Sequence, residues 1–223
     1  MLLVSQAWRD AYPTAHVGIL VLRDVINPTS STALDEKKQL LENRLRETYS
    51  DPQALQTSPI LKSYYEYYHL FKKTYHIRLQ LESIVSKGKP IAPAAALVES
   101  MFMAEMDNLL LTAGHDLNAI EPPLTLDVSN GSERYTLLRG DPQQLKPGDM
   151  FIRDNRGVIS SIIYGPDQRT RIHTGTVNVI YSVYAPKGIT VDSITRQMND
   201  IQANVLVFAP HTRVDLFEIY SGT

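Results

Sequence analysis

Two different hydrophobic periodicities divide this chain of 223 residues, and the division constrains its fold more than any other feature. In the first half, apolar residues recur at helical spacing, as Leu34, Leu41 and Leu45 do. Beyond the Pro122-Pro123 pair, short runs rich in β-branched and aromatic residues are separated by turn signals such as Asn130-Gly131. Helices followed by strands predict an α+β fold, with N-terminal helices packed on a strand-rich half that is either barrel-like or a mixed sheet.

The same patterns predict where individual elements begin and end. We expect helices over residues 31–49, 60–71, 79–85, 93–114 and 190–202, and strands over residues 17–22, 124–128, 135–138, 150–153, 158–164, 177–185 and 205–208. Gly114 would be the left-handed cap of the long helix, and residues 205–208 would pair with residues 17–22. No internal repeat or linker interrupts the pattern, so residues 1–223 are expected to form a single domain.

Composition excludes several classes of function. Twenty-two Lys and Arg against 24 Asp and Glu give a net charge of −2, so any contact with nucleic acid must be local. The absence of cysteine removes disulfides, thiolate metal sites and cysteine nucleophiles. No dinucleotide-binding, Walker, zinc-protease or nucleophile-elbow motif occurs, so we expect no cofactor and no metal. The absence of a signal-like or membrane-spanning run predicts a cytoplasmic protein that contacts no membrane.

Two polar clusters are candidates for chemistry or binding. His115, Asp116 and Glu121 would share a loop after the long helix, where imidazole and carboxylate groups can act together as acid and base, although a solvated helix end is the simpler interpretation. Arg169 and Arg171, between two strands, can each bind a phosphate or carboxylate through two hydrogen bonds. An ordinary solvated hairpin loop is the alternative.

A tyrosine-rich segment is a third candidate. Its tyrosines at positions 64, 65, 67, 68 and 75 are interleaved with cations that include Lys72 and Lys73, and such a mixture can stack RNA bases and contact phosphates. On a helix, however, Tyr64, Tyr68 and Phe71 share one face, which favours a role in the core. The methionines at positions 101, 103 and 106 are likewise expected in the core.

Several segments, taken in order, resemble one known family. They are residues 17–23, 67–75, 114–121, 146–154 and 169–179, and the likeness runs from about residue 15 to residue 185. The chain resembles the B3/B4 domain of the phenylalanyl-tRNA synthetase beta chain, particularly its free-standing single-domain relatives. In the synthetase this domain carries the editing site, where mischarged tyrosine is hydrolysed from tRNA. The resemblance implies an α+β fold and a tRNA or aminoacyl-tRNA partner, with no DNA partner.

The resemblance also leads to a specific expectation about the site. The editing histidine of the family falls on Asn118 and its glutamate on Ser182, so both positions carry neutral groups that can hydrogen-bond but cannot act as a base. We therefore expect binding of RNA, at the acceptor end of tRNA, and leave hydrolysis of a mischarged amino acid open. The alternative is a non-catalytic binder of an amino-acid-sized molecule in a repurposed pocket.

A polar strand face suggests where this ligand would bind. Alternation along residues 176–182 places Thr176, Asn178 and Ser182 on one face, with the expected loop that carries His115 and Asn118 nearby. Buried polar groups need partners, so this face must line a cavity or meet solvent. The predicted ligand site thus comprises His115, Asn118, Thr176, Asn178 and Ser182, and Arg169, Arg171, Lys72 and Lys73 are the predicted RNA contacts.

Overall fold

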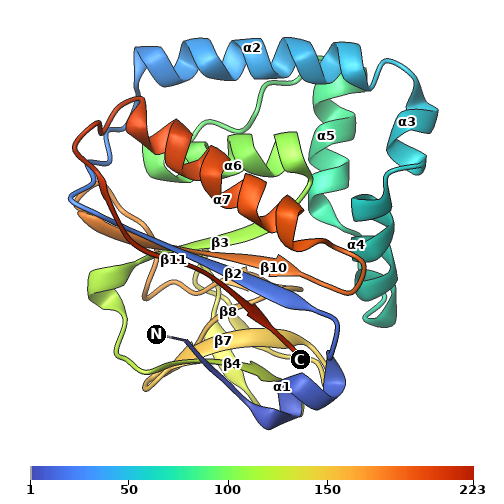
Figure 1. Cartoon of the computed structure of the whole chain (residues 1–223), viewed down its shortest axis with the longest axis vertical. Coiled ribbons are helices and arrows are strands. Elements are labelled where there is room, and N and C mark those ends of the chain that lie inside the picture. Colours follow the sequence, from blue (N-terminus) through green and yellow to red (C-terminus); the bar gives the residue numbers. More distant parts are fainter. Residues whose placement is uncertain (1) are drawn as a thin grey trace.

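The computed structural model describes residues 2–223 and contains a layer of helices above two layers of strands (Figure 1). In chain order the elements are β1 (Leu2–Val4), α1 (Gln6–Ala11), β2 (His16–Arg23), α2 (Thr32–Thr48), α3 (Pro52–Gln56), α4 (Pro59–Leu70), α5 (His76–Lys87), α6 (Ala96–Asn108), β3 (Leu111–Asp116), a short 3₁₀ turn (Leu117–Ala119), β4 (Leu124–Val128), β5 (Arg134–Thr136), β6 (Pro142–Gln144), β7 (Met150–Asp154), β8 (Gly157–Ser161), β9 (Gly165–Pro166), β10 (Asn178–Ala185), α7 (Val191–Leu206) and β11 (Arg213–Ser221). The predicted α+β class is confirmed.

The central layer is a four-stranded antiparallel sheet in the order β11-β2-β10-β3. Strand β2 is buried over residues 17–22, because the sheet is covered on both faces and both sets of alternating side chains are apolar. Its register pairs Val21 with Ile180 and Ile19 with Ser182. The sheet therefore places residues from the beginning, middle and end of the chain side by side.

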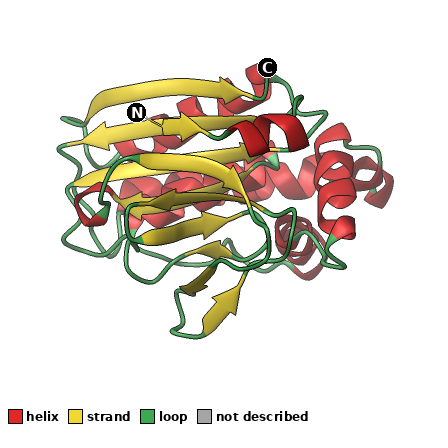
Figure 2. Ribbon diagram, turned by 90° about the horizontal axis from the view of Figure 1, so that it is seen from below, coloured by secondary structure: helices red, strands yellow, loops and turns green. Residues whose placement is uncertain are grey.

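The lower layer is a five-stranded mixed sheet in the order β1-β4-β7-β8-β9, in which only the β1–β4 pair is parallel. A separate hairpin of β5 and β6 lies beside it. Figure 2, seen from below, shows these strands in front of the helices. Across the described residues 2–223 the strands form open sheets and not a closed barrel, so the mixed-sheet alternative is the one observed.

Helix α7 packs directly on the central sheet because β2 has a glycine where the helix approaches. A Cβ atom at Gly18 would lie 2.5 Å from Cγ2 of Ile194. The helix directs a stripe of Ile194, Met198, Ile201 and Val205 toward the sheet, and all four side chains are fully buried. This stripe continues to Val205, which is why residues 205–206 are helical and the strand expected over residues 205–208 is wrong. The strand that pairs with β2 is β11.

The predicted long helix is also wrong at its C-terminal end. Helix α6 ends at Asn108 with Leu109 in the left-handed conformation, and residues 111–116 form the edge strand β3. Gly114 is not a helix cap. A Cβ atom there would lie 2.8 Å from Ile172 and 3.2 Å from the Tyr181 ring, so glycine is required for close packing. Pairing with β10 outweighs the helical pattern of the sequence, and it places His115 and Asp116 on a strand instead of a loop.

Most of the tyrosine segment belongs to the core, as its helical spacing predicts. Tyr64, Tyr67, Tyr68 and Tyr75 are buried, and the rings of Tyr64 and Tyr75 stack with centroids 4.1 Å apart. Tyr65 is the exception, with 58% of its surface exposed. Met101, Met103 and Met106 are buried too, as expected.

None of the helices described in residues 2–223 is long and apolar enough to cross a membrane.

Candidate functional site

A cavity of about 540 Å³ lies between α5, α6, the edge strand β3 and the segment that follows β8. Volumes of this size suit a ligand of amino-acid dimensions or somewhat larger. Its walls are mainly apolar, with Val98, Met101 and Phe102 on one side and Leu111, Ala113 and Ile172 on the other. Its polar side chains are His76, Gln80, Glu105, Thr112, Ser161, Arg171 and Tyr184.

Glu105 is the most unusual of these polar groups. Only 2% of the residue is exposed, and its Oε1 accepts a hydrogen bond of 2.7 Å from the backbone N–H of Thr112. No Lys, Arg or His among the described residues lies within ion-pair distance of it. Burial raises the pKa of Glu105 to about 8, against the opposing effect of the Thr112 N–H. The cavity wall thus carries a carboxyl group that is mainly protonated at neutral pH.

Fixed hydrogen bonds hold the floor of the cavity. The Tyr184 hydroxyl lies 2.6 Å from Ser160 Oγ, and Ser161 Oγ accepts from the Tyr164 N–H at 3.1 Å. The Tyr64 hydroxyl accepts from the Leu111 N–H at 2.8 Å and donates to the Tyr184 carbonyl oxygen. These bonds tie α4 to β3 and β10, so the cavity is built on rigid elements.

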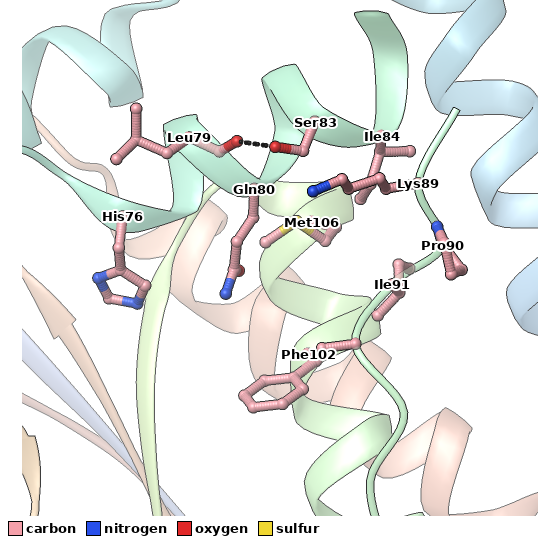
Figure 3. A pocket seen from close by; sticks show the side chains of 11 residues that line it. His76, Leu79, Gln80, Ser83, Ile84, Lys89, Pro90, Ile91, Phe102 and Met106 are labelled. Atoms are coloured by element: carbon pink, nitrogen blue, oxygen red, sulfur yellow. Dashed lines mark hydrogen bonds between the residues drawn. The ribbon is translucent and has the colours of Figure 1, made fainter. Parts of the chain in front are cut away.

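A second cavity, of about 350 Å³, adjoins the first and shares His76, Gln80 and Phe102 with it. In Figure 3, Gln80 and His76 extend from α5, and Phe102 lies on α6 across the same space. Both cavities therefore lie between α5 and α6. Lys89, in the loop after α5, provides a cation to this second cavity.

A groove lined by four arginines lies beside the main cavity. It has a volume of about 320 Å³ and includes Arg134, Arg156, Arg169 and Arg171, of which Arg171 also lines the main cavity. Two backbone contacts attach residues 170–171 to the edge strand β3. They are an isolated antiparallel β-bridge between Arg171 and His115 and a hydrogen bond from the Asp116 N–H to the Thr170 carbonyl oxygen. The attachment fixes Arg171 where the two spaces meet.

The four arginines differ in what they already bind. Arg169 is paired with Asp154 at 2.8 Å and with Asp167 at 3.7 Å, and it also donates to the Ala119 carbonyl oxygen. Burial opposes ionisation of Asp154, but the backbone N–H groups of Glu121 and Arg156 and the Arg169 guanidinium hold its pKa below the usual range. Arg169 is thus committed to internal ion pairs.

The other three arginines are more open. Arg156 lies 3.5 Å from Glu121 in an exposed pair. Arg171 donates to the Gln168 carbonyl oxygen, and neither Arg171 nor Arg134 forms an ion pair among the described residues. Both are exposed, so their guanidinium groups remain available to an anion.

The residues predicted to bind a ligand lie in several places, and none of the five lines the main cavity. His115 is fully buried, with Nδ1 2.8 Å from Thr170 Oγ1 and with no partner at Nε2. Burial, reinforced by the positive charge of Arg169, lowers the pKa of His115 to about 3. Its imidazole is therefore neutral. Because Thr170 donates to Asp167, the histidine carries its proton on Nδ1.

Two of the predicted side chains are in contact with each other. Asn178 Nδ2 donates to Asn118 Oδ1 at 3.0 Å, and Asn118 lines a separate groove of about 420 Å³ with Ile180. Ser182 lies four residues further along β10, a rise of about 13 Å, and is 1% exposed. A small ligand cannot touch both ends of this stretch.

Thr176 belongs to a third place, a small cluster around Asp116. The Thr176 hydroxyl donates to Asp116 Oδ2 at 2.9 Å, and His173 Nε2 lies 2.9 Å from the same oxygen. The cluster joins the end of β3 to the loop before β10. No group of three or more acidic or histidine side chains suited to a metal ion occurs within residues 2–223.

The predicted RNA contacts Lys72 and Lys73 follow α4. Both are exposed, and Lys73 Nζ lies 5.5 Å from the ring centroid of Tyr164, next to the cavity residue Gly165. In the turn after α4, Lys72 adopts a positive φ of 55°.

Sequence reasoning missed Glu105, although a signal was present. Leu97, Met101, Glu105 and Leu109 are spaced by four residues, so a carboxylate interrupts an apolar helical stripe. Charged residues are rarely buried without a partner, and this one marks the cavity.

Comparisons with known proteins find distant likenesses among solved structures. No protein-family model and no curated protein matches the chain. Among solved structures, an N-terminal fragment of the phenylalanyl-tRNA synthetase beta-subunit from Pyrococcus horikoshii is similar, with a TM-score of 0.48 and 12% identity. The similarity covers 98% of this chain and 53% of that fragment, so this chain spans about half the length of its neighbour. Likeness at this level identifies neither a family nor an activity.

Proposed function

We propose that the protein binds the acceptor end of an RNA, such as a tRNA, with an amino-acid-sized terminal group in the main cavity and phosphates in the arginine groove. The observation that carries the proposal is Arg171, which lines both spaces. One ligand with an apolar head and an anionic body can therefore occupy both. Free small amino acids would fill only the first.

Charge supports this arrangement locally, despite the net charge of −2. Arg134 and Arg171 are exposed and carry no ion pair among the described residues, and guanidinium groups bind phosphates through two hydrogen bonds. Lys72 and Lys73 are a second proposed phosphate contact. We assign Arg169 a supporting role instead, because its ion pairs with Asp154 and Asp167 hold the groove wall.

Hydrolysis of an aminoacyl ester is the finer part of the proposal. Among the described lining residues, His76 is the proposed base, because burial lowers the pKa of its imidazole and leaves it able to accept a proton near pH 7. A water molecule deprotonated by His76 would add to the ester carbonyl carbon. The bond between that carbon and the 3′-oxygen would then break, the protonated His76 would return its proton to the leaving 3′-oxygen, and the products would be a free amino acid and the 3′-hydroxyl of the RNA.

Binding is tested by titrating the protein with unfractionated tRNA at several salt concentrations. Affinity should fall as salt rises, and Arg134→Ala or Arg171→Ala should each weaken binding and reduce the slope against log salt by about 1. Arg196→Ala, an exposed change on α7, is the matched control and should have no effect. Absence of salt-sensitive binding would refute the RNA half of the proposal.

Hydrolysis is tested with a panel of mischarged tRNAs. Release of an amino acid above the buffer rate should be lost in His76→Asn, while tRNA binding persists. If no tRNA in the panel is deacylated, the enzymatic part is wrong and the binding part stands.

The second candidate is a binder of an amino-acid-like molecule alone, favoured by the apolar walls of the cavity. It predicts ligand binding that does not change in Arg134→Ala and shows little dependence on salt.

A further inference from the structure

We propose that the main cavity recognises an ammonium group carried on an apolar body, with the Glu105 carboxylate as its counter-ion. This inference deepens the proposed function by naming the chemical class of the bound head group. It does not depend on the RNA, because it concerns the cavity alone.

No positively charged side chain of the described residues lies beside the Glu105 carboxyl group, although a buried carboxylate needs such a partner when it is ionised. The side chain lies in a wall formed by Met101, Phe102 and Ala113, and its one hydrogen-bond donor is the Thr112 N–H. The comparable acid on the same helix, Glu99, is also buried but is paired with Lys38 at 2.6 Å. Glu105 has no such partner within the described residues, and it faces a space that a ligand can enter.

An ammonium ligand would supply the missing charge. Its N–H groups would donate to the Glu105 carboxylate, and its apolar body would cover the surrounding walls. Without a cation beside it, Glu105 is mainly neutral at pH 7, since burial raises its pKa to about 8. Binding of the ammonium form therefore ionises Glu105, and one proton leaves to solvent for each ligand bound at neutral pH. A carboxylate ligand would be repelled once the side chain ionises.

Other titratable groups near Glu105 do not reproduce this behaviour. They are Tyr64 and Tyr68 of α4, Tyr75 before α5, His76 of α5, Tyr184 of β10, and Arg171 at the opening. Burial raises the pKa of all four tyrosines well above 10, so they stay neutral through pH 9. Burial lowers the pKa of His76, so its imidazole is neutral above pH 7. Asp149, whose pKa is raised to about 7 by burial, titrates in this range but does not line the cavity.

The test compares three probes that share an isobutyl group, isobutylamine, isobutanol and isovalerate, titrated by calorimetry or NMR between pH 6 and pH 9. The affinity for the amine should rise about tenfold from pH 7 to pH 9, because the ionised fraction of Glu105 rises by that factor. The amine should bind at least tenfold more tightly than the alcohol at pH 9, and the carboxylate should not bind.

A variant pair assigns the effect to Glu105. Glu105→Gln keeps an acceptor for the Thr112 N–H and should remove both the preference for the amine and its pH dependence. Glu82→Gln, on the exposed face of α5, should behave as the unchanged protein. Equal affinity for amine and alcohol, affinity for the amine that falls as pH rises, or no binding of the amine at millimolar concentration would each overturn the inference. None of these results depends on RNA binding, so the two proposals can fail separately.

Discussion

The substitution Tyr64→Phe should destabilise the protein strongly, although it removes one oxygen atom. Tyr64 is 0% exposed, and its hydroxyl both accepts from the Leu111 N–H and donates to the Tyr184 carbonyl oxygen. Phenylalanine would leave two buried backbone groups without a partner, at about 1–3 kcal/mol each. The expected loss in the free energy of unfolding is therefore about 2–6 kcal/mol.

Urea unfolding followed by circular dichroism measures this difference, with unchanged m-values as evidence that the same surface is exposed. The neighbouring Tyr65→Phe is a matched control, because Tyr65 is 58% exposed and its loss should stay within about 0.5 kcal/mol. A loss below about 1 kcal/mol for Tyr64→Phe would show that this hydroxyl does not anchor α4 to the central sheet. Equal losses for both variants would contradict the assignment of Tyr64 to the core and Tyr65 to the surface.

Three further changes test separate parts of the structure. Burial raises the pKa of Asp149 from 3.8 to about 7, so its contribution to stability is complete below about pH 4 and is lost as the pH rises through 7. Between pH 5 and pH 8 the free energy of unfolding should therefore fall by about 2–3 kcal/mol less in Asp149→Asn than in the unchanged protein. Identical pH slopes of the two proteins in urea unfolding would refute this. Gly18→Ala should lower the free energy of unfolding by about 1–3 kcal/mol, because the added Cβ would lie 2.5 Å from the Ile194 side chain. An unchanged melting temperature would mean that α7 does not pack closely on β2. Val98→Trp should fill the main cavity and abolish small-ligand binding with an unchanged circular dichroism spectrum, and retained binding would place the ligand elsewhere.

The sequence predicts elements whose pattern and packing agree. Strand β2 follows its β-branched run, and α2 begins at Ser31, whose side chain accepts from the Leu34 N–H as the cap pattern predicts. The tyrosine segment also follows its helical spacing into the core. In each case the local preference of the residues matches the environment that the fold supplies.

The errors occur where tertiary pairing overrides local preference. Residues 111–114 continue a helical pattern but pair with β10, and Leu109 adopts a left-handed conformation that the sequence does not predict. Strand β11 is largely half-exposed at a sheet edge, so it lacks the apolar run that marks β2.

The candidate site depends on the same pairing. The cavity brings lining residues between positions 76 and 114 to lining residues between positions 138 and 184, and periodicity carries no information about such distant contacts. Glu105 is nevertheless visible as a carboxylate within an apolar stripe. The predicted residue Arg171 does line the cavity, whereas the polar face of β10 meets internal partners such as Asn118.

We propose that one ligand occupies the main cavity and the arginine groove together. Comparing the dissociation constants of two RNA ligands tests this proposal. The two ligands are an acceptor-stem RNA hairpin with a free 3′-hydroxyl and the same hairpin with an amino acid joined through a stable 3′-amide, drawn from a panel of apolar and aromatic amino acids. For at least one member of the panel, we expect the aminoacylated hairpin to bind at least tenfold more tightly than the free hairpin. Val98→Trp should abolish this gain, while the salt-dependent binding of the free hairpin remains. Equal affinity of the free and aminoacylated hairpins across the whole panel would contradict the proposal.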